Sequence, residues 1–490
     1  MTKLTVRVDD RLATISPMIY GHFAEHLGRC IYEGFWVGED SPIPNTRGIR
    51  TDTVAAMRKL GAPVVRWPGG CFADDYHWRD GIGPRDERPR RLNVWWHDTE
   101  SNRFGTHEFL DLCRQIGTEP YICLNVGSGT PEEAAAWVEY ANCARNTSRA
   151  AERAANGSPE PFAVRYWGVG NENWGCGGRF APDDYAREYR RFACYLRSRS
   201  SSPIELIACG HTGPEWNRKF LETLGDPHMI DHLSIHRYYN CGHAVDFSDT
   251  EYYNLFPRAL QVEDDITEAA TAIALYNRTP RKIGVIVDEW GVWHPEARGD
   301  SGLYQRNTLR DALACAAVFD AFNRHADVVT MANIAQTINV LQCVAQTAEE
   351  KMWLTPTYHA FALYKPHMGS TSLRLDLDDV PTVEAHKADG TPVQLPVLSA
   401  SASLDEARNS VCITVQNLHL TEPCDVAIRL RGGKVAKASA KVLTAKDVRD
   451  CNGPDSPNKV RPKRFQVDAR ATTLRATVPP HALVSVRIRL

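Results

Sequence analysis

The stretch THEFLDLCRQIGTEPYICLNVGSG, residues 106–129, contains one complete copy of the unit from which we expect the fold to be built. Its first half, residues 106–117, has the apolar spacing of an amphipathic helix. Its second half, residues 119–129, is a short apolar run that is typical of a buried strand. A helix followed at once by a buried strand indicates an α/β arrangement.

This alternation recurs along most of the chain. Eight apolar runs separate the helical stretches, at residues 18–26, 62–70, 119–129, 164–174, 204–211, 229–239, 282–290 and 326–336. Buried, β-branched strands between helices imply a parallel sheet. Eight such units predict a closed (β/α)₈ TIM barrel over residues 18–366. A doubly wound open sheet is the alternative, but the first run ends in YGHFAEH rather than a glycine-rich phosphate turn.

The end of the chain has a different pattern. Residues 367–490 contain short alternating segments such as NSVCITVQNL, with turn residues between them. This pattern predicts an all-β, jelly-roll-like sandwich of antiparallel strands. The N-terminal segment KLTVRVDD alternates in the same way, so we expect residues 1–17 to contribute a strand to that sandwich.

Charge and hydropathy exclude several classes of partner. The formal net charge is −3, and the densest basic run, PRDERPRRLN at residues 84–93, is interspersed with acids. We therefore expect a solvated loop there and no nucleic-acid partner, and a substrate that is neutral or is selected by local groups rather than by overall charge. No run of 18 apolar residues and no apolar leader segment occur, which favours a cytoplasmic protein without a membrane partner. A secreted protein whose signal has been removed is the alternative.

The 14 cysteines are scattered and form no CxxC pair. Several lie in apolar runs, including Cys123, Cys209 and Cys315. This distribution predicts buried reduced thiols in preference to a disulfide framework or a zinc site.

Two glutamates stand out among the polar residues that end the predicted strands. Glu172 follows the fourth run within GVGNENWGCGG, residues 168–178, and Glu289 follows the seventh within VDEW. The chemistry of such barrels takes place at the carboxyl ends of the strands, so these acids should face each other across the barrel mouth. Paired carboxylates suit glycoside hydrolysis, whereas ion pairs with Arg66 or Arg237 are the structural alternative.

Metal binding is the competing use of histidine and carboxylate clusters. His22 and His26 are four residues apart, but no HExxH motif occurs and the acids alternate with tryptophan and asparagine. Aromatic rings and amides suit sugar rings and hydroxyls better than a metal. We therefore expect no metal site and no cofactor.

Several motifs together resemble the α-L-arabinofuranosidases of glycoside hydrolase family 51. They are YGHFAEHLGRCIYEG (20–34), RWPGGCFADDYHWRDGIGP (66–84), GNENWGCGG (170–178), SIHRYY (234–239) and VDEWGVW (287–293). The resemblance spans residues 18–365 and implies a retaining barrel with an accompanying sandwich. It also implies removal of terminal arabinofuranosyl groups from arabinose-containing oligo- or polysaccharides by a homo-oligomer, such as a hexamer. A β-xylosidase or endoglucanase on the same barrel and a non-catalytic sugar-binding protein are the alternatives.

The resemblance also assigns individual residues. It makes Glu172 the general acid/base and Glu289 the nucleophile of a double displacement, in which Glu289 is held ionised by donors such as Tyr238 and Arg66. The residues that it places against the substrate are Glu25, Cys71, Asn171, His236, Tyr238 and Trp293. One departure concerns a glutamine that lines the sugar pocket in many family members. The stretch expected to carry it, WLTPTYHAF at residues 353–361, has none.

Overall fold

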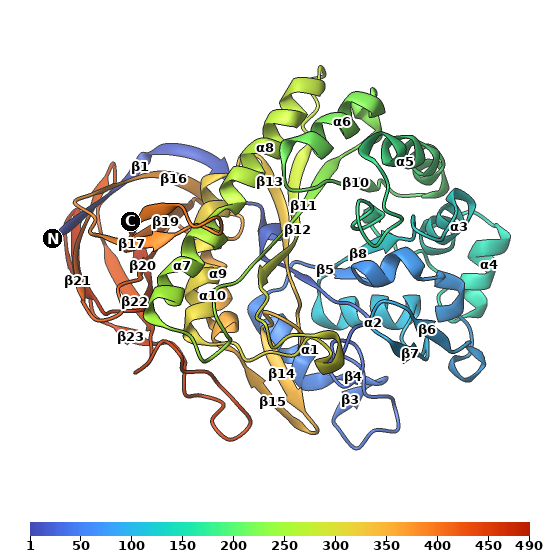
Figure 1. Cartoon of the computed structure of the whole chain (residues 1–490), viewed down its shortest axis with the longest axis horizontal. Coiled ribbons are helices and arrows are strands. Elements are labelled where there is room, and N and C mark those ends of the chain that lie inside the picture. The colour runs from blue at the N-terminus through green and yellow to red at the C-terminus, as the bar shows by residue number, and fades with distance from the viewer.

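A computed structural model describes residues 1–490 and shows a closed barrel joined to a second, curled β-sheet (Figure 1). The barrel strands are β2 (Gly21–Phe23), β5 (Val64–Trp67), β8 (Glu119–Leu124), β9 (Tyr166–Val169), β10 (Glu205–Cys209), β11 (His232–Tyr239), β12 (Gly284–Val292) and β13 (Val329–Ile334). They follow one another in chain order, and each pairs in parallel with its neighbours. Because β13 pairs with β2, the sheet closes, which confirms the predicted barrel and excludes the open sheet.

Helices connect the barrel strands and cover the outside of the barrel (Figure 1). They are α1 (Thr51–Leu60), α2 (Thr106–Ile116), α3 (Pro131–Asn142), α4 (Ser148–Ala155), α5 (Pro182–Leu196), α6 (Pro214–Leu224), α7 (Asp249–Leu260), α8 (Val262–Tyr276), α9 (Leu309–Arg324) and α10 (Pro356–Tyr364). Short 3₁₀ helices occur at η1 (Pro17–Tyr20), η2 (Cys71–Asp75), η3 (Trp78–Gly81), η4 (Arg85–Glu87), η5 (Arg197–Arg199), η6 (Pro227–Met229), η7 (Gly299–Ser301) and η8 (Lys365–His367). No helix has the length and apolar character needed to cross a bilayer.

The unit made of α2 and β8 shows how sequence sets these boundaries. At the start of α2, the Glu108 carboxylate accepts a hydrogen bond from the backbone N–H of Gly105 at 2.9 Å. At its end, Gly117 adopts a φ of 80°, a left-handed conformation that glycine tolerates best, and its N–H donates to the Cys113 carbonyl. The chain then enters β8, whose last four residues are buried. A capped helix and a buried strand therefore follow each other within 19 residues.

The barrel interior has its own small core. A separate cluster of six buried side chains fills it: Val64, Tyr121, Tyr166, Ile207, Ile286 and Met331. Each comes from a different strand and lies in the amino-terminal part of that strand. Side chains from the later positions of the same strands therefore line the opposite end, the barrel mouth.

The second sheet contains ten strands in the order β23-β22-β26-β20-β19-β16-β1-β21-β25-β24. Their bounds are β1 (Thr2–Thr14), β16 (Thr371–Asp378), β19 (Leu398–Asp405), β20 (Ser410–Asn417), β21 (Cys424–Arg431), β22 (Lys437–Leu443), β23 (Lys463–Phe465), β24 (Asp468–Arg470), β25 (Thr473–Val478) and β26 (Ala482–Arg489). Short hairpins lie outside both large sheets: β3 (Asn45–Thr46) with β4 (Ile49–Arg50), β6 (Arg91–Asn93) with β7 (Asp98–Glu100), β14 (Ala345–Ala348) with β15 (Lys351–Leu354), and β17 (Thr382–His386) with β18 (Pro392–Pro396).

The N-terminal strand β1 lies in the middle of this sheet. It pairs antiparallel with β16 and parallel with β21, and the β1–β21 pair is the one parallel pair in a sheet that is otherwise antiparallel. Leu4, Val6 and Val8 belong to a 23-residue apolar cluster, while Lys3 points to solvent. The alternation in KLTVRVDD thus reflects one buried and one exposed face.

Buried polar contacts join the second sheet to the barrel. The Asp320 carboxylate on α9 accepts hydrogen bonds from the hydroxyls of Ser399 and Ser401 on β19. Tyr364 at the end of α10 donates to the same carboxylate at 2.6 Å. Because these groups are buried, the contacts hold the sheet against α9 and α10 on the outside of the barrel.

We predict that Leu4→Ala destabilises the protein by about 2–4 kcal/mol, because it opens a cavity between β1 and its two neighbours. Lys3→Ala is the matched control on the same strand, and it should cost less than about 1 kcal/mol because its ion pair with Asp379 is exposed. Urea unfolding of the intact protein measures both. Equal effects of the two substitutions would contradict the placement of β1 inside the sheet.

Candidate active site

The structure brings Glu172 and Glu289 together at the barrel mouth. His236, on β11, lies between them: its Nδ1 is 2.8 Å from Glu172 Oε1 and 3.7 Å from Glu289 Oε2. An oxygen of each carboxylate and this ring nitrogen all lie within 4.8 Å of one another. Two acids that are 117 residues apart in the chain can therefore act on one small molecule.

Glu289 lies on β12 and is surrounded by donors. Arg66 Nη1 donates to its Oε1 at 2.8 Å, and the Tyr238 hydroxyl donates to its Oε2 at 2.6 Å. Burial works against ionisation, but the charges of His236 and Arg66 and the bond from Tyr238 outweigh it and lower the pKa of Glu289. The prediction that Tyr238 and Arg66 hold this carboxylate is confirmed.

Arg66 is the fully buried cation of the site. Besides Glu289, its guanidinium contacts Asp288 at 3.4 Å and donates to the Asn171 side-chain oxygen. The ring centroid of Phe23 lies 4.5 Å from the guanidinium carbon. Arg66 on β5 thus links the ends of β9 and β12.

The ion-pair alternative holds only in part. Glu289 forms an ion pair with Arg66. Arg237 instead pairs with Asp265 at 2.5 Å and forms no ion pair with either glutamate. Glu172 pairs with neither arginine; its only charged neighbour within 4 Å is His236. The environments of the two glutamates are therefore unequal.

Glu172 sits on a sharp turn directly after β9. Gly170 makes this turn with a φ of 85°, and a Cβ on it would lie 1.9 Å from the Asn173 side-chain oxygen. The Glu172 side chain is 20% exposed, against 7% for Glu289. Trp174 stacks on the His211 ring at a centroid distance of 4.2 Å. The acid is thus open to a substrate that approaches from outside.

The Asp74 carboxylate connects the loops that follow β8 and β9 at the barrel mouth. Its carboxylate accepts backbone N–H groups from Val126 and Gly127, after β8, and from Asn171, after β9, at 3.0 to 3.2 Å. Burial raises its pKa to about 6 despite these bonds. Through the bond to Asn171, Asp74 fixes the loop that carries Glu172.

Glu25 lies beneath the mouth, 2% exposed. It accepts hydrogen bonds from the Phe72 N–H at 3.1 Å, from Trp96 Nε1 at 3.3 Å and from Gln336 Nε2 at 2.9 Å. Burial and the charge of Glu289 raise the pKa of Glu25 to about 7. Glu25 therefore changes from neutral to charged near pH 7, within reach of the Glu289 charge.

The stretch at residues 353–361 carries no glutamine, but Gln336 contacts Glu25. Gln336 follows β13 directly, in the run ADVVTMANIAQ, and bonds to Glu25. The stretch at 353–361 forms the end of β15 and most of α10 instead. Gln336 thus reaches Glu25 from the end of the eighth strand.

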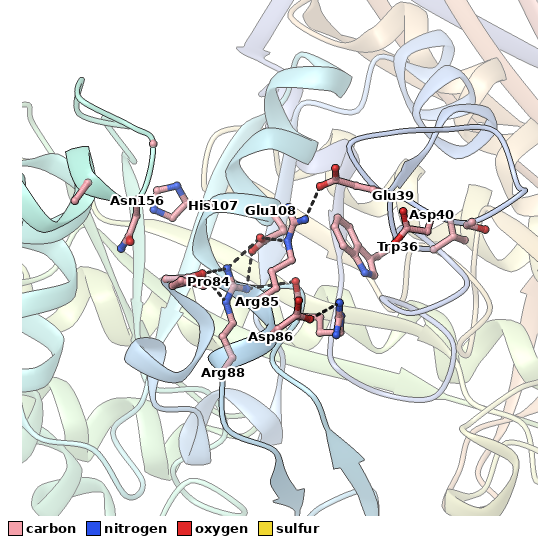
Figure 2. Close-up of a pocket in the computed structure, with 17 residues that line it drawn as sticks. Trp36, Glu39, Asp40, Pro84, Arg85, Asp86, Arg88, His107, Glu108 and Asn156 are labelled. Atoms are coloured by element: carbon pink, nitrogen blue, oxygen red, sulfur yellow. Dashed lines mark hydrogen bonds and ion pairs between the residues drawn. The ribbon is translucent and has the colours of Figure 1, made fainter.

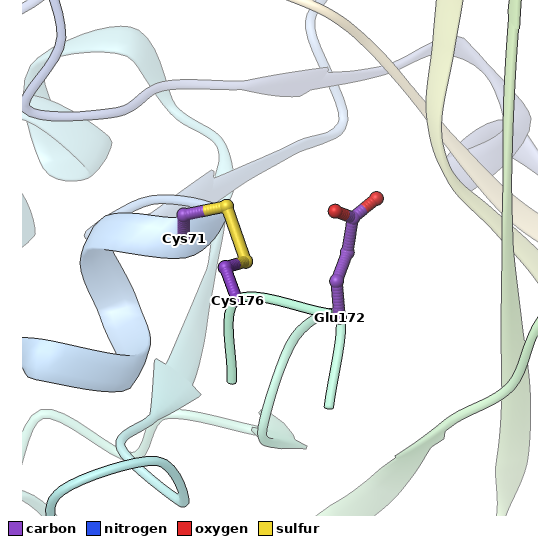
Figure 3. Close-up of side chains that lie close together, drawn as sticks. All are labelled: Cys71, Glu172 and Cys176. Carbon is purple, nitrogen blue, oxygen red and sulfur yellow. A yellow bond between two sulfur atoms is a disulfide. The ribbon is translucent and has the colours of Figure 1, made fainter. Parts of the chain in front are cut away.

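The prediction of reduced thiols is wrong for one pair. Cys71, at the start of η2, and Cys176, four residues after Glu172, form a disulfide beside the Glu172 carboxylate (Figure 3). The other twelve cysteines are free, as predicted. The pair lies 105 residues apart in sequence, but both residues follow glycine turns at strand ends that the barrel brings together. That shared position was the signal that could have revealed it.

The remaining predicted residues divide into two groups. Trp293 lies at the edge of a 460 Å³ cavity that Tyr238 also lines, and the two ring centroids are 5.1 Å apart. His26 instead bonds to the buried Glu100 at 2.8 Å, and His22 packs against Phe361 in the core. The two histidines are therefore not a pair of ligands for one metal.

A second, polar cavity of about 960 Å³ is lined by residues that include Arg85, Arg88 and Glu108 (Figure 2). None of the predicted site residues line it. Its charges are matched within the cavity, because Arg85 and Arg88 both pair with Glu108 and Arg85 also pairs with Glu39. We assign no catalytic role to it.

The fold and the site define the class of the protein. Two carboxylates with oxygens within 4.8 Å, one ionised and buried and the other more open, at the carboxyl ends of strands four and seven of a barrel, form the site of a glycoside hydrolase.

Comparison with known proteins narrows this class. Two profiles match the chain: "Alpha-L-arabinofuranosidase 1 domain" over residues 56–254 and "Alpha-L-arabinofuranosidase C-terminal domain" over residues 288–482. The intracellular exo-α-L-arabinofuranosidase of Bacteroides ovatus is 41% identical, over 99% of this chain and 95% of that protein. The family 51 arabinofuranosidase from Xanthomonas axonopodis pv. citri superposes with a TM-score of 0.94 at 39% identity, covering 99% of both chains. The α-L-arabinofuranosidase from Thermotoga maritima, solved with arabinose, gives 0.90 at 33% identity, covering all of both chains. The chain belongs to the α-L-arabinofuranosidases of glycoside hydrolase family 51.

We predict a pH-dependent stability difference for Glu25→Gln. In the unfolded chain Glu25 ionises near its ordinary value of 4.5, but in the folded enzyme only near 7. The ionisation of Glu25 therefore lowers the free energy of unfolding of the wild type as the pH rises from 4.5 to 7, by up to about 3 kcal/mol. Replacement by Gln removes this dependence.

Urea unfolding of the ligand-free enzyme at pH 5 and pH 8 measures the effect. The variant should gain stability relative to wild type between the two pH values, whatever its absolute stability. A constant difference between variant and wild type would contradict the raised pKa.

Proposed function

We propose that this arabinofuranosidase is exo-acting and retains the anomeric configuration, cleaving terminal arabinofuranosyl groups by double displacement. The observation that carries the proposal is the separation of Glu172 and Glu289: one carboxylate oxygen of each lies within 4.8 Å of the other. Retaining enzymes hold their carboxyl groups about 5–5.5 Å apart, whereas inverting enzymes leave about 6.5–9.5 Å for a water.

In the first step, Glu289 attacks the anomeric carbon while Glu172 donates a proton to the departing oxygen. Arg66 and Tyr238 support the assignment of Glu289 as nucleophile because they keep it ionised and fix both of its oxygens. The exposure of Glu172 supports its assignment as acid, because the leaving group must extend toward solvent.

In the second step, Glu172 accepts a proton from water, and that water releases the sugar from Glu289. His236 positions Glu172 through the 2.8 Å contact between Nδ1 and Oε1. Burial lowers the pKa of His236, but the charges of Glu289 and Glu172 outweigh this effect and raise it. A histidine that carries a proton between the two acids moderates their mutual repulsion in both steps.

Six residues are proposed to contact the arabinofuranosyl ring or its neighbour. Arg66 occupies the side-chain oxygen of Asn171, and one amide N–H of Asn171 donates to Cys176 Sγ at 3.8 Å, so the other N–H is left for a sugar hydroxyl. The others are Glu25, Cys71, His236, Tyr238 and Trp293, with Cys71 acting as a disulfide sulfur. Trp293 lines the 460 Å³ cavity beside Tyr238, where it can contact the leaving-group sugar.

The substrates are proposed to be arabinose-containing oligosaccharides or polysaccharides. The Bacteroides ovatus relative is an intracellular enzyme, which supports a cytoplasmic enzyme that acts on short oligosaccharides. We further propose a homo-oligomer, such as a hexamer. In this scheme residues 18–366 form the catalytic barrel, and residues 1–17 with 367–490 form the accompanying sandwich.

A panel of nitrophenyl glycosides tests the proposed specificity. We expect cleavage of the α-L-arabinofuranoside at the highest kcat/KM. Preferential cleavage of the β-xyloside or of a cellooligosaccharide would favour the alternative hydrolases. Binding without turnover would favour a sugar-binding protein.

We predict different consequences for the two acids. Glu289→Ala should abolish turnover of every glycoside. Glu172→Ala should slow hydrolysis of a natural arabinoside by about 10²–10⁴-fold, but should spare the first step for aryl leaving groups that need no proton. Steady-state and burst kinetics measure both, with the exposed Glu132→Ala as control. Equal slowing of both substrates by Glu172→Ala would contradict its role as acid.

A further inference from the structure

Three potential metal ligands meet beside the catalytic acid. Cys71 comes from the loop after β5, while Cys176 and Glu172 come from the loop after β9 (Figure 3). Both sulfurs and one Glu172 oxygen lie within 4.8 Å of one another. All three residues are partly exposed, so the group can be reached from solvent.

The chemistry of these donors depends on the redox state of the cysteines. In the disulfide form the sulfurs are weak donors. A dithiol reductant converts the disulfide into two thiols: two electrons and two protons pass to the sulfurs, and the reductant becomes a disulfide. Two thiolates and a carboxylate then form a ligand set that suits a thiophilic cation of the Zn²⁺ class.

We propose that Cys71, Cys176 and Glu172 bind one thiophilic divalent cation, such as Zn²⁺, once a dithiol has reduced the disulfide, and that this cation switches off hydrolysis by occupying the acid/base carboxylate. Binding displaces one proton from each thiol and, where the Glu172 carboxyl is protonated, the proton of that group as well, all of which pass to solvent. The inhibitory part of this inference rests on the proposed role of Glu172; the binding part does not.

The loop geometry fits such a site. Tetrahedral zinc with bonds of about 2.3 Å holds two sulfurs about 3.8 Å apart. The Cα atoms of Cys71 and Cys176 are 5.5 Å apart, so side-chain rotation alone can reach this separation. A water completes the coordination, as in zinc sites with three protein ligands.

The loops are also held together without the disulfide. Asp74, within the same turn as Cys71, accepts the Asn171 N–H at 3.2 Å and contacts the Asn173 side-chain nitrogen at 3.4 Å. Gly177 packs so closely on Asp74 that an added Cβ would lie 2.2 Å from the carboxylate. The thiols therefore stay near each other after reduction.

A metal on Glu172 would remove the proton donor. A carboxylate that coordinates a cation cannot also carry the proton that the leaving group needs. The contacts of Glu289 with Arg66 and Tyr238 do not involve the disulfide, so the reduced, metal-free enzyme keeps its nucleophile. In a reducing compartment the available Zn²⁺ would then set the activity.

A competing group of ligands shares Glu172. Glu172, His236 and Glu289 also lie within 4.8 Å of one another, but they offer no sulfur and do not depend on redox state. A cation bound there would act equally on oxidised and reduced enzyme and would show no thiolate signature. Comparing both redox forms therefore separates the two positions.

The first measurement is spectroscopic and needs no activity. The full-length enzyme is reduced with dithiothreitol, freed of it under nitrogen and titrated with Co²⁺. We expect one equivalent to produce a near-ultraviolet thiolate-to-cobalt band that Zn²⁺ abolishes. The oxidised enzyme and Cys176→Ser should lack it, whereas Cys194→Ser, which removes an exposed thiol elsewhere, should keep it. An equal band in oxidised enzyme or in Cys176→Ser would overturn the site.

The second measurement is kinetic. Stoichiometric Zn²⁺ should slow hydrolysis of a natural arabinoside by the reduced enzyme by about 10²–10⁴-fold, the range for loss of a general acid, and a chelator should reverse it. The oxidised enzyme and Cys176→Ser, each compared with its own metal-free rate, should be unaffected. Equal inhibition of the oxidised form would overturn the proposal in favour of the His236 group. A cobalt band without inhibition would overturn the switch while leaving the binding site intact.

Discussion

The buried guanidinium of Arg66 is the interaction on which the site depends. It is fully buried, and it contacts Glu289 and Asp288 on β12 and the side chain of Asn171 after β9. Asp288 is itself fixed by the hydroxyl of Tyr121 at 2.6 Å and by the side chain of Asn333 at 2.8 Å. An unpaired buried charge is very costly, so the cation and its carboxylates hold the ends of strands two, four and seven at one spacing. The distance between Glu172 and Glu289 follows from this constraint.

The same constraint makes the two acids chemically different. Glu289 is enclosed by Arg66, Tyr238 and His236, which stabilise its charge. Glu172 extends from a glycine turn toward solvent and contacts a single charged partner, His236. Glu25 feels the charge of Glu289 and has no ion pair of its own, and its pKa rises to about 7. The carboxyl groups of Glu289, Glu172 and Glu25 thus differ in charge and exposure because their neighbours differ.

Much of this arrangement could be predicted from the sequence, because it depends on local patterns. The apolar runs gave all eight barrel strands, and the ends of the fourth and seventh runs gave Glu172 and Glu289. The alternation in KLTVRVDD gave the strand β1. What failed depended on contacts between distant segments. The Cys71–Cys176 disulfide joins loops 105 residues apart, and the bond between Gln336 and Glu25 joins segments 311 residues apart. The hydrogen bonds that Asp74 accepts from three backbone N–H groups could not be predicted from any local sequence pattern.

The central claim is that Glu172 and Glu289 are close enough for a covalent glycosyl-enzyme to form. The anomer of arabinose that is released first tests this claim most directly. Proton NMR during hydrolysis of an aryl α-L-arabinofuranoside, recorded before the anomers interconvert, should show α-L-arabinofuranose as the initial product. Initial release of the β anomer would mean a single displacement by water and would contradict the account.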